Sequence, residues 1–423
     1  MNFSYAHLSD LHLGSWRDPK MRDLSTQAFL TALDQCINYP VDFILFSGDI
    51  FNTSLPSLET LKIVTKKIKE LQEKNIPLYL IAGSHDFSPS GKTMLDVLEN
   101  AGLLKNVCKG SVNPETKKLQ LKFTIDPKTQ AKITGLIGRK GQLDRSYYEN
   151  LDRDNLEQEL GYKIFLFHTT LTELKPKHLE HIESQPASFL PRYFNYYAGG
   201  HIHHPALVNL PDYGPMTYPG ALFPNNFSEL EKYGHGGYYL IKVAEIDLES
   251  DGEEAETINY NQEITWIKLK VIDHLGLNLN CSHLNSSQIQ QKISDYFQDK
   301  EVKDKLITIR LSGTLSQGKM SEINFKSIIE KLYQEGAYFI LKNTSLLNST
   351  EFEEIKIKYS NPETMEEDLI KEHLQQIKLF DIETELNLTK SLLIHLNTSK
   401  KEGETITDFN NRIQSEMDKL LNL

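Results

Sequence analysis

The sequence predicts an α/β domain in the first part of the chain, followed by a smaller α+β domain and a helical tail. Short apolar runs, helical segments between them and two changes of composition lead to this prediction. The runs at residues 41–46, 77–81 and 163–167 are too short and too uniformly apolar for surface helices, so we expect buried strands. Residues 57–73 place apolar side chains at helical spacing with lysines opposite, which is typical of a helix covering a sheet.

The two changes of composition divide the chain into three parts. Residues 245–263 are acidic and polar, which predicts a boundary between a first domain at 1–245 and a second at 263–360. The second alternates strand-like and helical segments, as a compact α+β module does. Residues 361–423 carry apolar stripes at helical spacing and form the predicted tail. Such stripes show only that some surface is covered, so the tail either docks on its own protein or binds a partner.

Composition restricts the classes of function. The 423 residues carry a net charge of -12, which argues against a protein that coats nucleic acid through a globally basic surface but leaves a local contact open. Three widely spaced cysteines predict neither a disulfide framework nor a thiolate zinc site. The chain opens directly into a strand-like segment, and no stretch reaches the length of a membrane span. We therefore expect a cytoplasmic protein without membrane contact.

Aspartate and histidine residues follow the predicted strands at several places. Asp10-x-His12 and His201-x-His203 each have the i, i+2 spacing that puts two side chains on the same side of an extended segment. Between these pairs lie Gly48-Asp49, Gly83-Ser84-His85-Asp86 and His168. Because α/β sheets place their ligand sites at the carboxyl ends of strands, we expect these residues to converge.

The expected chemistry is hydrolysis of phosphate esters. Two metals about 3.5–4 Å apart can hold a hydroxide between them and neutralise the phosphoryl oxygens. Asp49 is the expected bridging carboxylate. The other expected ligands are Asp10, His12, His168, His201 and His203. Each motif alone has a simpler explanation, such as a turn aspartate or a histidine at a strand end, but their joint order favours one dinuclear site.

These motifs resemble the calcineurin-like metallophosphoesterase superfamily, whose pattern is D-x-H, GD, GNHD, a histidine after a strand, and GH-x-H. Within it, Leu8–Gly14 and Gly48–Phe51 resemble the meiotic recombination eleven / SbcD family of double-strand-break repair nucleases. The resemblance covers most of the chain, strongly to about residue 245. It implies a sandwich of two sheets flanked by helices, a capping domain at 263–360 and a C-terminal helical tail.

The resemblance also implies the role of each site residue. One metal would be held by Asp10, His12, Asp49 and His203, and the other by Asp49, His168, His201 and whatever Ser84 can offer. His85 would stand beside the scissile phosphate without binding metal, as a proton donor or a stabiliser of the transition state. The family prefers manganese, whereas imidazole and carboxylate ligands by themselves also accept iron or zinc.

Two positions depart from the family pattern. Ser84 replaces an asparagine and offers a shorter hydroxyl in place of a carbonyl oxygen. Asn52 stands where the nuclease family often has a histidine. Our hypothesis is that the second metal binds more weakly and that activity needs more manganese.

The resemblance implies a manganese-dependent DNA exonuclease and endonuclease subunit of a repair complex in a prokaryotic-type cytoplasm or nucleoid. The tail would bind the coiled-coil ABC-type ATPase of that complex, and the nuclease would be a homodimer. Arg139, Lys140 and Arg145 would contact the DNA backbone, although a solvated face is the simpler explanation of these charges. Two alternatives remain: another dinuclear phosphatase or phosphodiesterase, or a weakened nuclease that serves mainly as a scaffold for the ATPase.

Overall fold

The structure is a computed structural model that describes residues 2–39, 41–88, 91–246, 259–349, 370, 381–401 and 404–421. The chain divides into two compact units. One comprises Met1–Cys281, Ser287–Ser312 and Ile323–Leu346, and the other comprises Ser282–Ser286, Gly313–Glu322 and Leu347–Leu423. The three cysteines, Cys36, Cys108 and Cys281, are free.

The first sheet has six strands in the order β14-β13-β1-β2-β3-β4. Its strands are β1 (Asn2–Leu8), β2 (Phe43–Ser47), β3 (Leu78–Ile81), β4 (Lys105–Asn106), β13 (Gly236–Ile246) and β14 (Asn259–Leu269). Strands β1 to β4 run parallel, β13 pairs with β1 in antiparallel orientation, and β14 pairs with β13 in antiparallel orientation. Helices α1 (Pro19–Asn38) and α2 (Leu58–Glu73) pack against one face, so β2 and β3 are buried along their whole length.

The second sheet also has six strands, in the order β11-β12-β10-β9-β8-β7. Its strands are β7 (Thr124–Ile125), β8 (Lys132–Gly135), β9 (Lys163–His168), β10 (Tyr196–Gly200), β11 (Ala206–Val208) and β12 (Met216–Tyr218). Apolar side chains of both sheets, such as Tyr5, Phe43, Ile164 and Leu166, form one buried cluster. The predicted sandwich of two sheets flanked by helices is therefore confirmed.

Most of the predicted elements are present. The strands expected at 41–46, 77–81 and 163–167 are β2, β3 and β9, and the helix expected at 57–73 is α2, whose first turn is capped by the Ser57 hydroxyl. Residues 263–269, at the start of the predicted second domain, form the last part of β14, which pairs with β13 along its full length. Alternation of polar and apolar residues predicts a half-exposed strand, but it does not specify the sheet that the strand joins.

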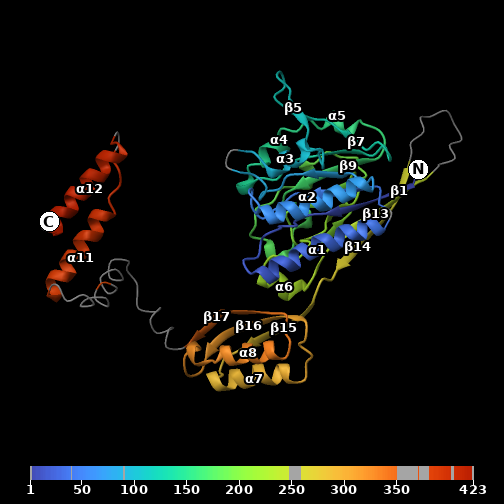
Figure 1. Cartoon of the computed structure of the whole chain (residues 1–423). Helices are drawn as coiled ribbons and strands as arrows, with labels where there is room; N and C mark the ends of the chain where they lie inside the picture. Colours follow the sequence, from blue (N-terminus) through green and yellow to red (C-terminus); the bar gives the residue numbers. More distant parts are fainter. Residues whose placement is uncertain are drawn as a thin grey trace, which may run out of the picture. The chain divides into compact units, whose positions relative to one another are not determined.

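A smaller sheet contains β15 (Asp273–Asn280), β16 (Lys305–Leu315) and β17 (Phe339–Ser349), with α7 (Ser286–Gln298) and α8 (Phe325–Gln334) on one face (Figure 1). The remaining regular elements of the first 246 residues are α3 (Met94–Asn100), β5 (Gly110–Val112), β6 (Leu119–Leu121), α4 (Arg145–Glu149), α5 (Asp154–Glu157) and α6 (Phe227–Tyr233). Single 3-10 turns occupy Lys140–Gln142, Thr172–Leu174, Lys177–Leu179, Ala187–Phe189 and Met320–Glu322.

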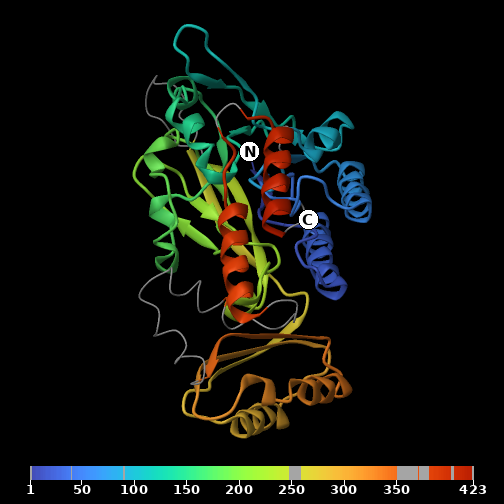
Figure 2. The same ribbon diagram turned by 90° about the vertical axis from the view of Figure 1, so that its left-hand side faces the viewer.

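Two helices near the C-terminus, α11 (Ile382–Leu396) and α12 (Ile406–Leu421), contact each other (Figure 2). The Asp381 carboxylate caps α11 by accepting hydrogen bonds from the next turn. Residues 361–369, at the start of the predicted tail, lie outside the described residues. Across the described part of the chain, no helix is long and apolar enough to cross a membrane.

Candidate metal centre

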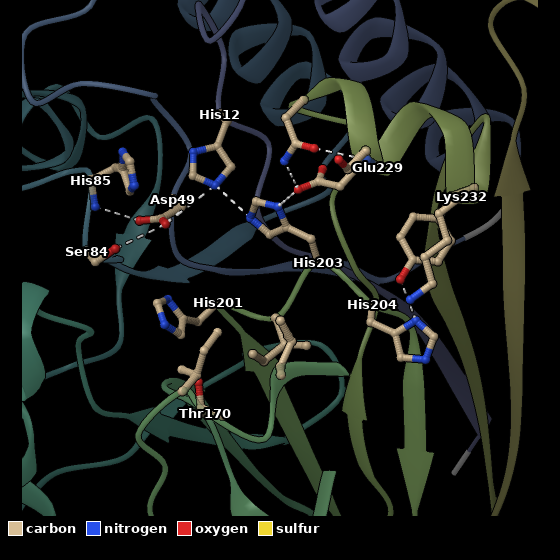
Figure 3. Close-up of a pocket in the computed structure, with 16 residues that line it drawn as sticks. His12, Asp49, Ser84, His85, Thr170, His201, His203, His204, Glu229 and Lys232 are labelled. Atoms are coloured by element: carbon tan, nitrogen blue, oxygen red, sulfur yellow. Dashed lines mark hydrogen bonds and ion pairs between the residues drawn. The ribbon is translucent and has the colours of Figure 1, made fainter. Parts of the chain in front are cut away.

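The carboxyl ends of five strands bring the predicted site residues together. Asp10 and His12 follow β1, Asp49 follows β2, Ser84 and His85 follow β3, His168 ends β9, and His201 and His203 follow β10. Six of these eight residues line a cavity of about 480 Å³ (Figure 3), and the other two, Asp10 and His168, are buried. The carboxyl ends of strands from two sheets therefore share one site, as α/β sheets arrange their ligand crevices.

The first cluster consists of Asp10, His12 and His203, with Asp49 beside it. The Nε2 atoms of His12 and His203 lie 3.1 Å apart. Oδ1 of Asp10 is 3.8 Å from Nε2 of His12 and 3.7 Å from Nε2 of His203. Two imidazole nitrogens and a carboxylate that face one another at these distances are a donor set that suits a divalent cation.

The second cluster consists of Asp49, His168 and His201, whose candidate ligand atoms lie within 4.8 Å of one another. Nδ1 of His168 donates to the carbonyl oxygen of Ser47 at 2.7 Å, because a carbonyl can only accept. Nε2 of His168 therefore faces Oδ2 of Asp49 at 3.2 Å and is buried without a hydrogen bond. A buried nitrogen and a carboxylate that face each other can bind the same cation. The hydrogen bond from Nδ1 to the carbonyl keeps the proton on Nδ1 and so leaves the lone pair of Nε2 for that cation.

Charge interactions inside the site are strong because the groups are buried. Burial raises the pKa of Asp49, but the neighbouring His168 and His12 outweigh this effect and hold that pKa below its usual range. Burial lowers the pKa of His168, and Asp49 outweighs burial and raises it. Burial and the nearby His203 lower the pKa of His12, which keeps this imidazole neutral. Bound cations would satisfy the same carboxylates.

The backbone around the ligands is held in an unusual conformation. Four predicted ligands have positive φ angles: 51° at Asp10, 42° at His12, 53° at Asp49 and 89° at His201. Non-glycine residues rarely adopt this region, and it costs free energy that the surrounding fold must offset. The clustering of these angles at one cavity supports a functional role for the loops.

Two glycines allow these loops to approach closely. A Cβ atom at Gly48, whose φ is 89°, would lie 2.4 Å from Nδ1 of His168. A Cβ atom at Gly83 would lie 2.3 Å from the backbone nitrogen of Asp49. Both glycines are therefore required by the packing of the ligand loops.

The loop after β3 places Ser84 and His85 beside Asp49. The hydroxyl of Ser84 lies 3.4 Å from Oδ2 of Asp49, and the backbone nitrogen of His85 donates to Oδ1 of Asp49 at 2.7 Å. Nδ1 of His85 is 2.9 Å from the carbonyl oxygen of Asn52 and therefore carries its proton. The buried Asp86 holds the loop by accepting from the backbone nitrogens of Gly83 and Phe51. Nε2 of His85 is then the ring nitrogen left for a ligand.

Glu229 on α6 is a site residue that the sequence reasoning missed. Its Oε1 accepts from Nδ1 of His203 at 2.9 Å, which directs the other ring nitrogen toward His12. Asn226, three residues earlier, caps α6. The spacing of Asn226 and Glu229 predicts a helix start, but it gives no sign that Glu229 contacts His203.

The basic residues predicted to contact DNA are not among those that line the cavity. The guanidinium of Arg139 lies 5.1 Å from the ring centre of Phe87, and Nε of Arg145 pairs with Glu149 at 2.7 Å. Lys140 lies in a 3-10 turn. Their part in binding DNA stays a prediction.

Comparisons with known proteins agree with this geometry. A model of the family described as calcineurin-like phosphoesterase matches residues 3–205. The DNA double-strand break repair protein Mre11 of Methanococcus maripaludis is 31% identical over 56% of this chain. That alignment spans 62% of the relative's length. The Mre11 protein of Sulfolobus acidocaldarius is 25% identical over 95% of this chain and 97% of its own length. An uncharacterized metallophosphoesterase of Bacillus subtilis, YhaO, is 22% identical over 73% of this chain and 71% of its own length.

Proposed function

We infer that this chain, whose residues 3–205 match the family described as calcineurin-like phosphoesterase, is a DNA nuclease that hydrolyses phosphodiesters with two divalent metals. The observation that carries the proposal is the pair of clusters on either side of Asp49; within each cluster the candidate ligand atoms lie within 4.8 Å of one another. The names of the Mre11 relatives support DNA as the substrate.

The proposed ligands divide into two sets that share Asp49. Asp10, His12, Asp49 and His203 would hold one ion, and Asp49, His168, His201 and Ser84 would surround the other. A bound metal pair supplies an activated water and neutralises charge on the phosphoryl oxygens. We propose manganese for both positions, and the donor set accepts it.

The remaining groups orient the ligands and the substrate. The carbonyl of Asn52 fixes the ring of His85 by accepting from Nδ1, so Nε2 can donate only while the ring is doubly protonated. In that form it would give a proton to the leaving oxygen or a hydrogen bond to the transition state. Ser47 orients His168, and Glu229 orients His203, each through the ring nitrogen that is not turned toward Asp49 or His12. These contacts set the direction of the ligand lone pairs before any metal binds.

Cleavage of a labelled DNA duplex tests the substrate. Manganese-dependent cleavage that is faster than hydrolysis of small phosphodiesters and monoesters supports a nuclease. Time courses on end-blocked and circular DNA separate the exonuclease and endonuclease activities that we propose. Hydrolysis of the small esters alone would favour the phosphatase alternative.

The two other parts of the chain have proposed roles as well. Residues 263–360 would shape access of DNA to the nuclease domain at 1–245. In the tail at 361–423, exposed apolar side chains such as Ile382, Ile394 and Ile406, between 59% and 71% exposed, would bind the coiled-coil ABC-type ATPase. Deletion after Asn361 should leave DNA cleavage intact and remove ATPase binding. Retained binding would contradict this role of the tail.

Ser84 favours one alternative, a weakened nuclease that mainly supports the ATPase. Its hydroxyl remains beside Asp49, 3.4 Å from Oδ2. If His85→Ala abolishes DNA cleavage while the fold and ATPase binding survive, the scaffold alternative fails. Light scattering at several protein concentrations tests the proposed homodimer. We propose the prokaryotic cytoplasm or nucleoid as the location of the protein.

A further inference from the structure

A second cavity of about 300 Å³ adjoins the cavity at the metal centre. The residues that line both cavities are His203, His204, Glu229, Lys232 and Tyr233. In Figure 3, His204 and Lys232 lie beyond His203, on the side away from Asp49. A ligand whose phosphate lies beside Asp49 therefore has a neighbouring space that its next group can enter.

Four aromatic side chains from separate segments line the second cavity: His204 after β10, Tyr233 at the end of α6, His235 before β13 and Trp266 on β14. Hydrogen bonds at their edges fix these rings. Nε1 of Trp266 donates to the carbonyl oxygen of Pro219 at 3.0 Å, and the Tyr233 hydroxyl lies 2.8 Å from Nδ1 of His204. Nδ1 of His235 lies 3.1 Å from the carbonyl oxygen of the next residue. A ligand therefore meets ring surfaces whose orientation is already set.

The rest of the wall suits a flat, uncharged group. Apolar lining comes from Pro205, Pro219, Ala221 and Pro224. Among the residues that line this cavity, the one carboxylate is Glu229, and its oxygens already accept from His203, Asn225 and Asn226. Lys232 adds a positive charge to the part shared with the metal centre, where a phosphate would be favourable.

We propose that the second cavity binds one nucleobase of the substrate by stacking, beside a phosphate at the metal centre. This inference rests on the proposed nuclease function. The volume lies at the lower end of the range for small-ligand pockets, which suits a single ring system. Because every base has a π face and the ring edges are already engaged, we expect little preference among the bases.

Trp266 gives the test a local signal, because the chain contains only two tryptophans. In metal-free Trp16→Phe protein, deoxyadenosine monophosphate should quench the fluorescence of Trp266 saturably, whereas 2-deoxyribose 5-phosphate should not. The Trp266→Phe protein, which keeps Trp16, should show no saturable change. Trp16→Phe removes the hydrogen bond from Nε1 of Trp16 to the carbonyl oxygen of Pro224, a residue that lines the second cavity. Nucleotide affinity is therefore also measured by equilibrium dialysis with the unsubstituted protein.

Variants at Tyr233 separate stacking from general damage to the fold. Tyr233→Leu should weaken nucleotide binding by roughly 5- to 150-fold, the range for loss of one stacking contact. Tyr233→Phe keeps the ring and loses only the hydroxyl contact to His204, so it should bind nucleotide more tightly than Tyr233→Leu does. Tyr39→Leu, which alters a side chain that is 57% exposed and lines neither cavity, is the matched control.

Equal quenching by the sugar phosphate, or no saturable nucleotide binding, would overturn the base-binding proposal. Unchanged affinity in Tyr233→Leu would overturn it as well. If Tyr233→Leu does not fold, the fluorescence of Trp266 in the Trp16→Phe protein still shows whether the nucleotide binds through its base. DNA cleavage by the same proteins keeps the two proposals apart. Cleavage without nucleotide binding refutes the base site alone, and nucleotide binding without cleavage refutes the nuclease proposal alone.

Discussion

Glu229→Gln should weaken the first metal site, because the glutamate accepts three hydrogen bonds that a glutamine cannot all accept. Oε1 faces Nδ1 of His203 at 2.9 Å and Nδ2 of Asn226 at 2.6 Å, while Oε2 faces the backbone nitrogen of Asn225 at 2.8 Å. If the amide oxygen faces His203, the amide nitrogen meets the N–H of Asn225. If the amide turns over, Nδ1 of His203 must accept, so its proton moves to Nε2 and blocks the metal-facing lone pair.

The magnitude follows from the loss of this orientation. The side chain of Glu229 is only 16% exposed, so water compensates poorly for the lost hydrogen bond. Substitutions of groups that orient metal ligands cost roughly 10- to 100-fold in metal affinity. We expect manganese affinity at the tighter site to fall by that amount in isothermal titration of chelator-treated protein.

The control for this experiment is Glu73→Gln, at the exposed end of α2, which should titrate like the unsubstituted protein. Urea unfolding shows whether the Glu229 variant is folded under the titration conditions. A folded Glu229→Gln protein with unchanged affinity at the tighter site would refute the orienting role of Glu229.

Three further predictions concern the same centre. His85→Asn should lower the rate of DNA cleavage by about 10²- to 10⁴-fold while manganese titration stays unchanged, because the ring is proposed to act on the substrate; an equal loss of metal affinity would make His85 a ligand instead. Ser84→Asn should tighten the weaker of two manganese sites, since it restores a carbonyl oxygen next to Asp49, and two equally tight sites in the unsubstituted protein would contradict the hypothesis behind it. Gly83→Ala should destabilise the fold by about 2 kcal/mol or more in urea unfolding, because its Cβ would lie 2.3 Å from the backbone nitrogen of Asp49. Gly102→Ala is the control, because a Cβ there meets nothing within 4 Å although φ is 71°. Equal stability of the two variants would show that the loop at Gly83 accommodates the methyl group without cost.

Local sequence patterns were sufficient to predict two buried strands of the first sheet, β2 and β3, and the helix between them. β2 and β3 are continuous apolar runs, and α2 repeats its apolar side chains at helical spacing. Each pattern depends on residues close in sequence, so it can be recognised without knowing the neighbouring elements. The pairing of β14 with β13 could not be recognised in this way, because alternation in a strand is the same whichever sheet the strand joins.

Some residues of the candidate site could likewise be recognised from sequence, whereas others are shown only by the tertiary structure. Asp10, Asp49 and His168 could be selected from sequence alone because each stands at or just after a strand, and parallel strands bring such positions to one edge. Only the tertiary structure shows Glu229 against His203, the positive φ angles of the ligand loops, and Trp266 beside the cavity next to the metal centre. These features depend on contacts between segments far apart in the chain. The sequence by itself therefore determines which groups can bind metal, and the packing of the two sheets determines how those groups are oriented and what lies beside them.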